Sequence, residues 1–463
     1  MIHDVIVIGG GISGLATAYD LMQRGLDVHL LERQVRTGGN AISERFDGFL
    51  MEHGPTTFNA SVPQAVEQIE ALGLLDQAHD LGPDVKRRYL RDNGRLTGIP
   101  ASMTGFLTSN YLSLRGRTRI LAEGLIPRHK GGEESIHAFT ARRFGREFAD
   151  KVMDPMAAGI FMGDSRELSI SGAFPKLAEM EQALGSITRG VLRARRGSEP
   201  GRHLYSWDGG IGTIPQVLTR HLGARVHTGI AVSGLGKTAH GFAVKTREGS
   251  RQARAVVLAV QPHVAAQLLE RVDPVGAETT GRIQAPPVNV GFFGYRREQV
   301  AHPLDGLGFL STRDNDRILS GVQFASTMYP QRAPGGFVAI SAYAGGVRNP
   351  ELAQADAAEL TALMHDELAE GLGIKGAPVV TRLRRWPLGL PQYALGHPGR
   401  RTKLNQSSDR VAGLFLTGNY INGVSVANCL ASGSSVCKRV AEFLHGAGPV
   451  AGRAGKDDLK YSI

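Results

Sequence analysis

The chain opens with an apolar segment that runs directly into a glycine-rich turn. Val5 to Ile8 precedes Gly9-Gly10-Gly11-Ile12-Ser13-Gly14, and the next apolar segment ends at Glu32. In a strand–turn–helix unit, the first glycine permits a tight turn, the second lets a pyrophosphate approach, and the third allows close helix–strand packing. Free helix N–H groups bind phosphate, and an acidic residue at this distance binds ribose hydroxyls. A Rossmann-type dinucleotide fold is predicted, with nucleotide-binding candidates Gly9, Gly11, Ser13, Gly14 and Glu32.

A second glycine element follows and narrows the choice of nucleotide. After Arg33, the chain carries Arg36 followed by Gly38-Gly39. Adjacent glycines let main chain approach a bulky ligand, and an arginine offers a fork of donors to phosphate. NAD dehydrogenases do not need this element, which resembles the RxGG segment that glutathione-reductase and amine-oxidase flavoproteins place along FAD. FAD is therefore the expected cofactor, and these four residues join its candidates; the alternative is an ordinary loop with a helix-capping glycine.

Composition excludes several other classes of protein. At 463 residues the chain is long enough for two or three interleaved domains. The only cysteines, Cys429 and Cys437, indicate neither a disulfide framework nor a metal cluster, so no metal site is predicted. The net charge of +10 comes without a helix-turn-helix, zinc-finger or RNP-like pattern, so no nucleic-acid partner is expected. Anionic lipid or a polycarboxylate substrate accounts for the charge better.

The ends of the chain bear on its location. The first strand is expected within a few residues of Met1, which leaves no room for a cleavable signal, and no apolar stretch approaches the roughly 18 residues that span a bilayer. We expect a cytoplasmic protein, with peripheral contact on the inner face of the cell membrane as an open alternative. A homodimer is a candidate assembly.

Hydrophobic periodicity gives a coarse order of elements. Helices are expected over residues 61–73, 112–124, 133–148 (opening on an acidic first turn) and 174–187, followed by a basic loop with Arg189, Arg193, Arg195, Arg196 and Arg202. Strands are expected over residues 255–260, 288–295, 318–324 and 336–343. The strand at Leu414 to Thr417 breaks at Gly418-Asn419, and residues 424–442 should form a long helix whose positive N-terminal end faces a ligand.

Taken in order, many short segments resemble one enzyme family. The chain is similar to the protoporphyrinogen and coproporphyrinogen oxidases, oxygen-dependent FAD enzymes within the amine-oxidase and phytoene-desaturase superfamily. The matching segments are Glu52-His53-Gly54-Pro55 with Phe58, Glu134-Ser135-Ile136, Arg142-Arg143-Phe144-Gly145, Asp154-Pro155 with Gly159, Gly163-Asp164, Leu168-Ser169, Ala173-Phe174-Pro175, Pro391-Gln392-Tyr393, Gly396-His397, and Gly423-Val424 to Cys429 with Gly433. The chain departs from the family at Thr56-Thr57, where Asn-Ser is common, and at Thr417, where Ala is common.

This resemblance implies an activity. Enzymes of the family remove hydride repeatedly from a porphyrinogen, and dioxygen reoxidises the flavin to give hydrogen peroxide. Because the macrocycle gains aromaticity, the protein mainly has to hold a methylene bridge near the flavin and keep the site dry. No catalytic side chain is therefore assigned. Whether the ring carries two propionates or four is left open.

The resemblance also assigns binding residues. It places a propionate-binding arginine at Arg88, although Arg87 and Arg91 adjoin it, and macrocycle contacts at Gly159 and at Leu307, Gly308 and Leu310. Further FAD contacts fall at Gly54, Pro55, Thr56, Val232, Trp386, Gly418, Asn419, Val424 and Val426. Core packing is the competing interpretation for the apolar members of this set.

The expected fold class is α/β, with a discontinuous FAD domain, a mixed-sheet substrate domain and a helical insertion. The FAD domain should comprise residues 1–85, 205–270 and 385–446, the substrate domain 86–99 and 271–384, and the insertion 100–204, with a tail at 447–463. Leucines and aromatic residues beside arginines in residues 103–125 suit a membrane interface, or else a helix packed on the domain.

Three alternative functions remain at this stage. An amine oxidase is disfavoured because such enzymes carry a lysine near the flavin, and no lysine occurs between Lys245 and Lys375. A carotenoid desaturase shares the glycine elements but fits the Asp154-Pro155 and Pro391-Gln392-Tyr393 segments less well. A non-catalytic flavin-binding scaffold would differ from an oxidase by showing no turnover with oxygen.

Overall fold

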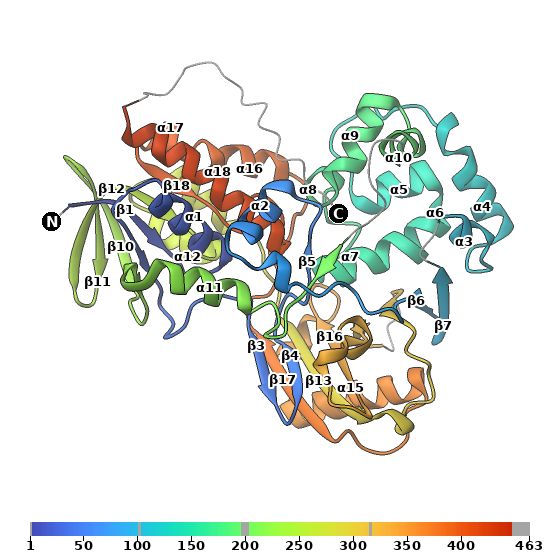
Figure 1. Ribbon diagram of the computed structural model, residues 1–463. Helices are drawn as coiled ribbons and strands as arrows, with labels where there is room; N and C mark the ends of the chain where they lie inside the picture. Colours follow the sequence, from blue (N-terminus) through green and yellow to red (C-terminus); the bar gives the residue numbers. More distant parts are fainter. Residues whose placement is uncertain (1, 101–102, 196–202, 314–316, 447–463) are drawn as a thin grey trace.

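The computed structural model describes residues 2–100, 103–195, 203–313 and 317–446. Three regions stand apart in Figure 1: a helix-covered sheet at the left, a second sheet below, and a group of helices at the upper right. The left region contains blue, green, yellow and red segments, so the chain enters it several times. This is a mixed α/β architecture with a discontinuous first region.

The first sheet contains the N-terminal strand. It has the order β10-β11-β12-β1-β2-β9, with β18 beside the end of β12. Its strands are β1 (Ile2–Ile8), β2 (Val28–Leu31), β9 (Val226–His227), β10 (Val232–Thr238), β11 (Gly241–Thr246), β12 (Gly249–Leu258) and β18 (Leu414–Leu416). The pairs β1–β2, β1–β12, β2–β9 and β12–β18 are parallel, whereas β10, β11 and β12 form antiparallel hairpins.

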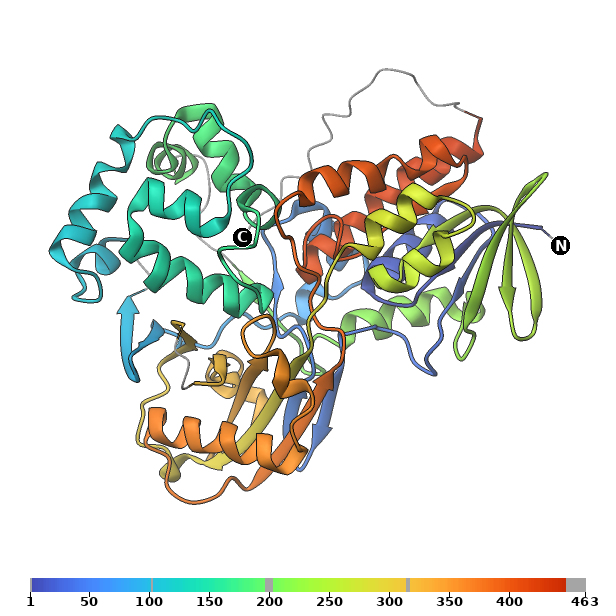
Figure 2. The same ribbon diagram turned by 180° about the vertical axis from the view of Figure 1, so that it is seen from behind.

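Helices cover both faces of this sheet. Alternating residues of β1 separate the two cores, because Val5 and Val7 pack on one face and Ile6 and Ile8 on the other. The first face is covered by α1 (Ile12–Gln23), α2 (Pro63–Ala71), α11 (Thr213–Leu222) and α18 (Val426–Leu444), and the second by α12 (Pro262–Leu269), α13 (Pro274–Gly281), α16 (His397–Asn405) and α17 (Ser407–Arg410). Figure 2 shows the second set from behind. The domain boundary expected at residue 270 thus falls between α12 and α13, which pack together.

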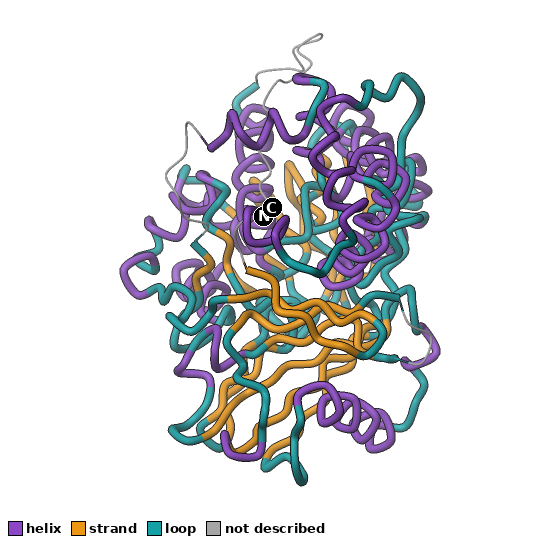
Figure 3. The backbone as a smooth tube through the Cα atoms, turned by 90° about the vertical axis from the view of Figure 1, so that its right-hand side faces the viewer, coloured by secondary structure: helices purple, strands orange, loops and turns teal. Residues whose placement is uncertain are grey.

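The second sheet is mixed. Its order is β17-β13-β16-β15-β14-β6-β7, and only the β14–β6 pair is parallel among the described strands. The strands are β6 (Arg87–Asp92), β7 (Arg95–Pro100), β13 (Val288–Arg296), β14 (Gly306–Ser311), β15 (Leu319–Gln323), β16 (Phe337–Gly345) and β17 (Val380–Trp386). Helix α15 (Ala357–Leu372) packs on one face, and α14 (Ala325–Met328) adjoins β16. Most helices of the molecule lie above these strands in Figure 3.

Short strands connect the first two regions. The hairpin β3 (Ser43–Phe46) with β4 (Phe49–Glu52) follows the second glycine element, and β5 (Phe58–Asn59) pairs with β8 (Leu204–Tyr205). Phe49 of this hairpin packs on Phe292 of β13, with ring centroids 6.1 Å apart. The chain just after the second glycine element is therefore fixed to the second sheet.

The third region consists of helices. They are α3 (Met103–Thr108), α4 (Leu114–Leu121) with a 3-10 turn η2 (Ala122–Leu125), α5 (Ile136–Phe144), α6 (Arg146–Phe148), α7 (Asp154–Phe161), α8 (Ile170–Ala173), α9 (Pro175–Leu184) and α10 (Ile187–Arg195). None of the helices described is both long and apolar enough to cross a bilayer.

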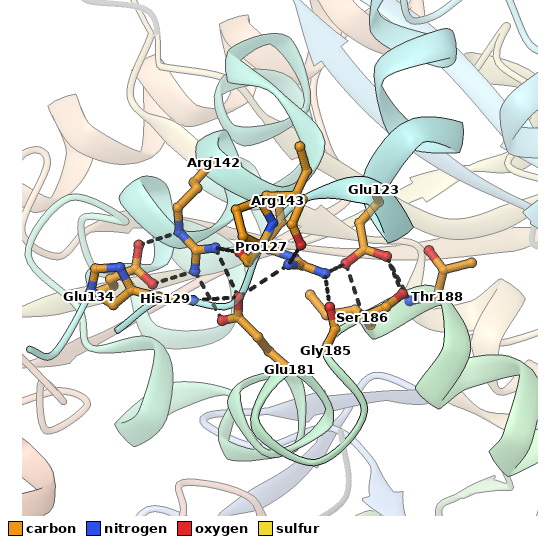
Figure 4. Close-up of polar contacts among 12 residues, drawn as sticks. Glu123, Pro127, His129, Glu134, Arg142, Arg143, Glu181, Gly185, Ser186 and Thr188 are labelled. Atoms are coloured by element: carbon orange, nitrogen blue, oxygen red, sulfur yellow. Dashed lines mark hydrogen bonds and ion pairs between the residues drawn. The ribbon is translucent and has the colours of Figure 1, made fainter. Parts of the chain in front are cut away.

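A buried ionic cluster holds this region together (Figure 4). Arg143 is fully buried and pairs with Glu123, which also accepts hydrogen bonds from Ser186 Oγ (2.6 Å) and Ile187 N (3.0 Å) at the start of α10. Arg142 binds Glu134 (2.6 Å) and Glu181 (2.9 Å). The cluster ties α5, α9, α10 and η2 to one another.

Three expectations about this region are wrong in detail. The helix expected from residue 133 begins at Ile136, because Ser135 caps it by accepting a hydrogen bond from Ala138 N. Arg189, Arg193 and Arg195 lie in α10 and not in a loop, whereas the remaining two arginines of the expected loop, at 196 and 202, lie outside the described residues. The segment 174–187 divides into α9 and the start of α10, with Gly185 in the left-handed conformation between them.

Candidate cofactor and substrate site

The carboxyl ends of neighbouring parallel strands meet at one edge of the first sheet. Gly9 follows β1, Glu32 follows β2, Ala259 follows β12, and Gly418 lies just beyond β18. Ala259 N donates to Ile8 O (2.8 Å), and Thr417 N donates to Leu258 O (3.0 Å), so these ends are directly adjacent. Open parallel sheets bind ligands at this edge. The structure therefore brings the N-terminal and C-terminal glycine turns to one place.

The first glycine turn has the shape that a dinucleotide needs. A Cβ at Gly14 would lie 2.0 Å from Gly9 O, so a side chain there would separate α1 from β1. A Cβ at Gly11 would have no neighbour within 4 Å, which leaves open space at the position expected to face a pyrophosphate. Gly11 is also the N-cap of α1 and provides no side-chain cap. The residues present thus fit a bound phosphate at this helix end.

Glu32 lies beside this turn. Its carboxylate accepts hydrogen bonds from Gly10 N (2.6 Å) and Gln34 N (2.7 Å). Ile230 N donates to Glu32 O (2.9 Å), and this contact brings Val232, at the start of β10, toward the same strand end. Arg33 is exposed. Glu32 and Val232 are therefore positioned together where the resemblance places the adenosine half of FAD.

The second glycine element packs directly on the first. Gly38 N donates to Gly10 O (2.7 Å), and Gly39 lies against Gly11. Arg36 donates to Gly39 O (3.1 Å), which holds the turn closed. The Gly54-Pro55-Thr56 segment follows alongside, because a Cβ at Gly54 would lie only 2.3 Å from Asn40 O.

Arg36 belongs to a cluster of cationic groups that sequence reasoning did not find. Arg384 of β17 stacks on Trp386, with its guanidinium carbon 4.1 Å from the ring centroid, and Trp386 Nε1 donates to His53 O (2.7 Å). Burial and the charge of Arg384 lower the pKa of Arg36. Burial and the charges of both arginines lower the pKa of His53. Such convergence of positive groups at the glycine turn favours an anionic ligand.

The C-terminal turn is held by Tyr393. Its hydroxyl donates to Asn419 O and accepts from Gly423 N (2.8 Å). Helix α18 then begins at Val426, with Ser425 Oγ accepting from Asn428 N (3.1 Å). Val424 packs with the apolar core of the helical region, whereas Val426 packs with that of the first sheet. This turn therefore joins the two regions.

The predicted substrate residues lie together between the second sheet and the helical region. Leu310 of β14 pairs with Leu90 of β6, and a register shift in β14 leaves the Leu307-Gly308 segment opposite Arg88. Arg88 is exposed and lies on the same strand face as Leu90, two residues away. A Cβ at Gly159 of α7 would lie 2.3 Å from Leu310 Cδ2, so α7 and β14 approach closely there. These residues form one strip along the junction.

An apolar cluster connects this strip with the cofactor edge. Met162 at the end of α7 packs with Val288 and Val290 of β13, and Trp386 and Tyr343 adjoin them. Tyr343 is partly buried, and the desolvation of its hydroxyl raises its pKa; the hydroxyl donates to Gln323 Oε1 (3.0 Å) on the strand that pairs with Gly308. Sequence reasoning missed Tyr343, since an isolated tyrosine in an apolar strand carries no site signal.

A buried ion pair supports the adjacent loop. Arg332 donates to Glu52 Oε1 (3.0 Å), Thr56 O (2.7 Å) and Ser206 Oγ (3.0 Å). Both side chains of the pair are about 1 % exposed, and burial raises the pKa of Glu52. Arg332 thus fixes the carbonyl of Thr56, a predicted FAD contact.

The chain belongs to the flavin containing amine oxidoreductase family, whose model matches residues 12–441. It is accordingly a flavoprotein oxidoreductase, with FAD as its cofactor. Its relatives include the chloroplastic protoporphyrinogen oxidase 1 of Spinacia oleracea, 30 % identical over 95 % of this chain and 84 % of that protein. The protoporphyrinogen oxidase of Bos taurus is also 30 % identical, over 94 % of this chain and 98 % of that protein. The coproporphyrinogen III oxidase of Bacillus subtilis is 25 % identical over 95 % and 98 %.

Solved structures share the fold. A proposed protoporphyrinogen oxidase of Exiguobacterium superposes with a TM-score of 0.81 at 21 % identity, covering 95 % of this chain and 98 % of that one. Cyclohexylamine oxidase of Brevibacterium oxydans gives a TM-score of 0.72 at 16 % identity, covering 96 % and 100 %. These similarities confirm the predicted mixed α/β fold, which is that of flavin enzymes of the amine-oxidase type.

Proposed function

We propose that this protein oxidises a porphyrinogen to the corresponding porphyrin in haem biosynthesis, with dioxygen as electron acceptor and hydrogen peroxide as product. The observation that carries the proposal is whole-length similarity to protoporphyrinogen and coproporphyrinogen oxidases. The strip of predicted substrate residues between the second sheet and the helical region supports it, because the exposed Arg88 lies opposite Leu307-Gly308, and Leu310 beside them packs on an apolar core. A porphyrinogen has the matching chemistry of a broad apolar ring with carboxylate side chains.

The roles of the residues follow from their positions. Bound FAD supplies the hydride acceptor and passes electrons to dioxygen. The turn at Gly9 to Gly14 would hold its pyrophosphate, and Glu32 its ribose. Arg88 would bind a propionate through a charge-assisted hydrogen bond. Leu307 and Leu310 would cover the ring and exclude water, and Gly159 would let the ring approach the main chain of α7.

Two substrates test the proposal directly. The purified holoenzyme is incubated separately with protoporphyrinogen IX and coproporphyrinogen III, and porphyrin fluorescence and hydrogen peroxide are followed together. We expect porphyrin to form with at least one of them, accompanied by peroxide. Peroxide formed from an aliphatic amine, with no oxidation of either porphyrinogen, would instead identify an amine oxidase.

We further propose that the helical region touches the inner face of the cell membrane and that the protein is otherwise cytoplasmic. Leu114, Leu121 and Leu125 are 74, 72 and 84 % exposed; Leu114 and Leu121 are seven residues apart, on one side of α4, and Leu125 ends the η2 turn that follows. Helix α10 packs on η2 and presents a fourth exposed leucine, Leu192, between the exposed Arg189 and Arg193. Exposed leucines among arginines suit an anionic interface. Tyr111 and Leu112, also considered for this role, are buried in the core.

A further inference from the structure

The side chains of three histidines and one aspartate gather beside strands β1, β2 and β9 of the first sheet. His3 is the second residue of β1, His29 the second of β2, and Asp27 immediately precedes β2. His227 lies in β9, the next strand along. His3 and Asp27 lie at the amino ends of β1 and β2, away from the cofactor edge, whereas His29 is level with Ile6 and His227 pairs with Leu31 near the carboxyl end of β2.

The aspartate lies between two imidazoles. Asp27 Oδ2 is 2.8 Å from His3 Nδ1, and Asp27 Oδ1 is 3.3 Å from His29 Nε2. One nitrogen of each histidine and a carboxylate oxygen all lie within 4.8 Å of one another. A tetrahedral zinc ion with bonds of about 2.0–2.1 Å holds its ligand atoms about 3.4 Å apart. Side-chain shifts of up to about 1.4 Å would bring these atoms to the separations of a metal-binding triad.

His227 supplies the second, independent observation. Its Nε2 is 2.8 Å from His29 Nδ1, and the two rings stack with centroids 5.1 Å apart. If His29 Nδ1 donates to His227, the lone pair of His29 Nε2 points toward Asp27. Metal-binding histidines almost always have their other nitrogen hydrogen-bonded in this way, which fixes the tautomer and the ring orientation. A simple His–Asp contact does not require such a partner.

We propose that His3, Asp27 and His29 bind a divalent transition-metal ion of the zinc or copper class, with His227 as a positioning residue. Imidazole and carboxylate together suit these ions, whereas Mg²⁺ and Ca²⁺ prefer all-oxygen sites. The Asp27 side chain is half exposed, so water can complete the coordination. The sequence indicated no metal site, because its two cysteines form no cluster and these ligands come from separate strands.

The surrounding charges are mixed. Asp4 Oδ2 accepts a hydrogen bond from Asp27 N (3.1 Å), while Asp4 Oδ1 pairs with Arg254 (3.0 Å). The positive charge of Arg251 acts on His29, and Glu248 lies 3.5 Å from Arg251 and offsets it in part. Because the neighbouring charges largely cancel, the affinity for a metal ion would come from His3, Asp27 and His29 themselves. Its metal would join β1 to β2 and stabilise the folded state by mass action.

The test uses untagged, FAD-loaded protein. Zn²⁺ is titrated calorimetrically, and bound Cu²⁺ is examined by electron paramagnetic resonance, in which nitrogen hyperfine splitting reports imidazole ligands. We expect one saturable ion per chain, lost in His3→Ala and in His29→Ala. Asp27→Asn keeps the hydrogen-bonding shape and should also weaken binding. His227→Phe should weaken it about 10- to 100-fold while the ion stays nitrogen-ligated.

A matched control separates the site from other histidines. His240 is exposed in the turn between β10 and β11, and His240→Ala should leave metal binding unchanged. Zn²⁺ should raise the melting temperature of the unaltered protein but not that of His29→Ala, with FAD content equal in both. Absence of saturable binding, or binding that survives both His3→Ala and His29→Ala, would overturn the proposal and leave only a hydrogen-bonded cluster.

Discussion

At the scale of single residues, Arg88 offers the sharpest test of substrate binding. It is exposed opposite the Leu307-Gly308 segment, whereas its neighbour Arg87 lies on the other strand face, 3.4 Å from Asp305. A hydrogen bond to a charged group contributes about 1.5 to 3 kcal/mol. Arg88→Ala should therefore raise KM for the porphyrinogen about 10- to 100-fold, with FAD content unchanged. Steady-state kinetics with fluorescence detection measures this.

Arg87→Ala serves as the matched control for that experiment, since it removes an equal charge one position away. Its KM should stay close to that of the unaltered enzyme. Equal effects of the two substitutions would show that general surface charge attracts the substrate and that Arg88 has no specific role.

Arg384 is a second test, directed at the cofactor. In the absence of an anion, Arg384 and Arg36 repel each other, so Arg384→Ala should leave the cofactor-free protein as stable as before or slightly more so. The same substitution should weaken FAD binding by about 10-fold, because it removes one positive group of the cluster beside the glycine turn that we expect to hold the diphosphate. Flavin fluorescence during reconstitution gives the affinity, and thermal melts of the cofactor-free protein give the stability.

Arg382 lies two residues earlier on the same strand face, is exposed and stacks on Phe46 at 4.6 Å. Arg382→Ala should therefore leave FAD affinity unchanged. An Arg384→Ala protein that binds FAD normally would contradict the role assigned to the cationic cluster.

These residues show where sequence reasoning reaches its limit. The glycines at 9, 11 and 14 and Glu32 could be predicted, because their function depends on spacing within one strand–turn–helix unit. Arg384 could not, since only the pairing of two distant parts of the chain brings it near Arg36. The roles of Arg88 and Gly159 came from resemblance, and the structure adds that both lie along one junction.

At the scale of elements, the joint between η2 and α10 depends on the ionisation of Glu123. Burial opposes its charge, but hydrogen bonds from Ser186, Ile187 and Arg143 lower its pKa from 4.5 to about 2. Between pH 2 and pH 4.5, Glu123 is therefore protonated in the unfolded chain but ionised in the folded protein. The stabilisation, about 3 kcal/mol, is thus complete above pH 4.5 and is lost as the pH falls toward 2.

Glu123→Gln should lower the free energy of unfolding at pH 7 by roughly 3 kcal/mol, because it removes one of the two carboxylates that pair with the buried Arg143, and should flatten the pH dependence below 4.5. Chemical denaturation at several pH values measures both effects. Glu179, exposed on α9, provides the control: Glu179→Gln should leave the pH profile intact. A steep acid profile retained in Glu123→Gln would show that other carboxylates carry it.

Element types were easier to predict than element limits. The strand at residues 288–295 and the long C-terminal helix have strong periodicity and were found within a few residues. The helix expected from residue 133 was placed too early. Acidic residues are common in the first turn of a helix, but Glu134 precedes the helix and pairs with Arg142 near its end. Arg189, Arg193 and Arg195 looked like a solvated loop, although Glu123 caps the helix that carries them.

At the scale of the whole molecule, three regions contribute to one junction. The first sheet brings the cofactor turns, the second sheet brings Arg88 and Leu310, and the helical region brings Gly159 and the core on which Val424 packs. Local patterns could predict each region separately. Their meeting depends on apolar contacts between distant segments, such as Met162 with Val288, which no local pattern encodes.

The proposed membrane contact would be made by the outer side of the helical region. Helix α4 lies at the outer edge of that region in Figure 1, and burying each of its exposed leucines is worth about 1.5 to 3 kcal/mol. A protein with the three substitutions Leu114→Ser, Leu121→Ser and Leu125→Ser should therefore lose most of its binding to anionic liposomes in sedimentation, while it keeps its porphyrinogen oxidation in detergent.

Leu363 provides the control: it is 45 % exposed on α15, and Leu363→Ser should bind liposomes normally. Raised salt should weaken binding of the unaltered protein, because arginines surround the leucines. If the unaltered protein stays in the supernatant with anionic liposomes at low salt, α4 does not contact a membrane and the proposal is wrong.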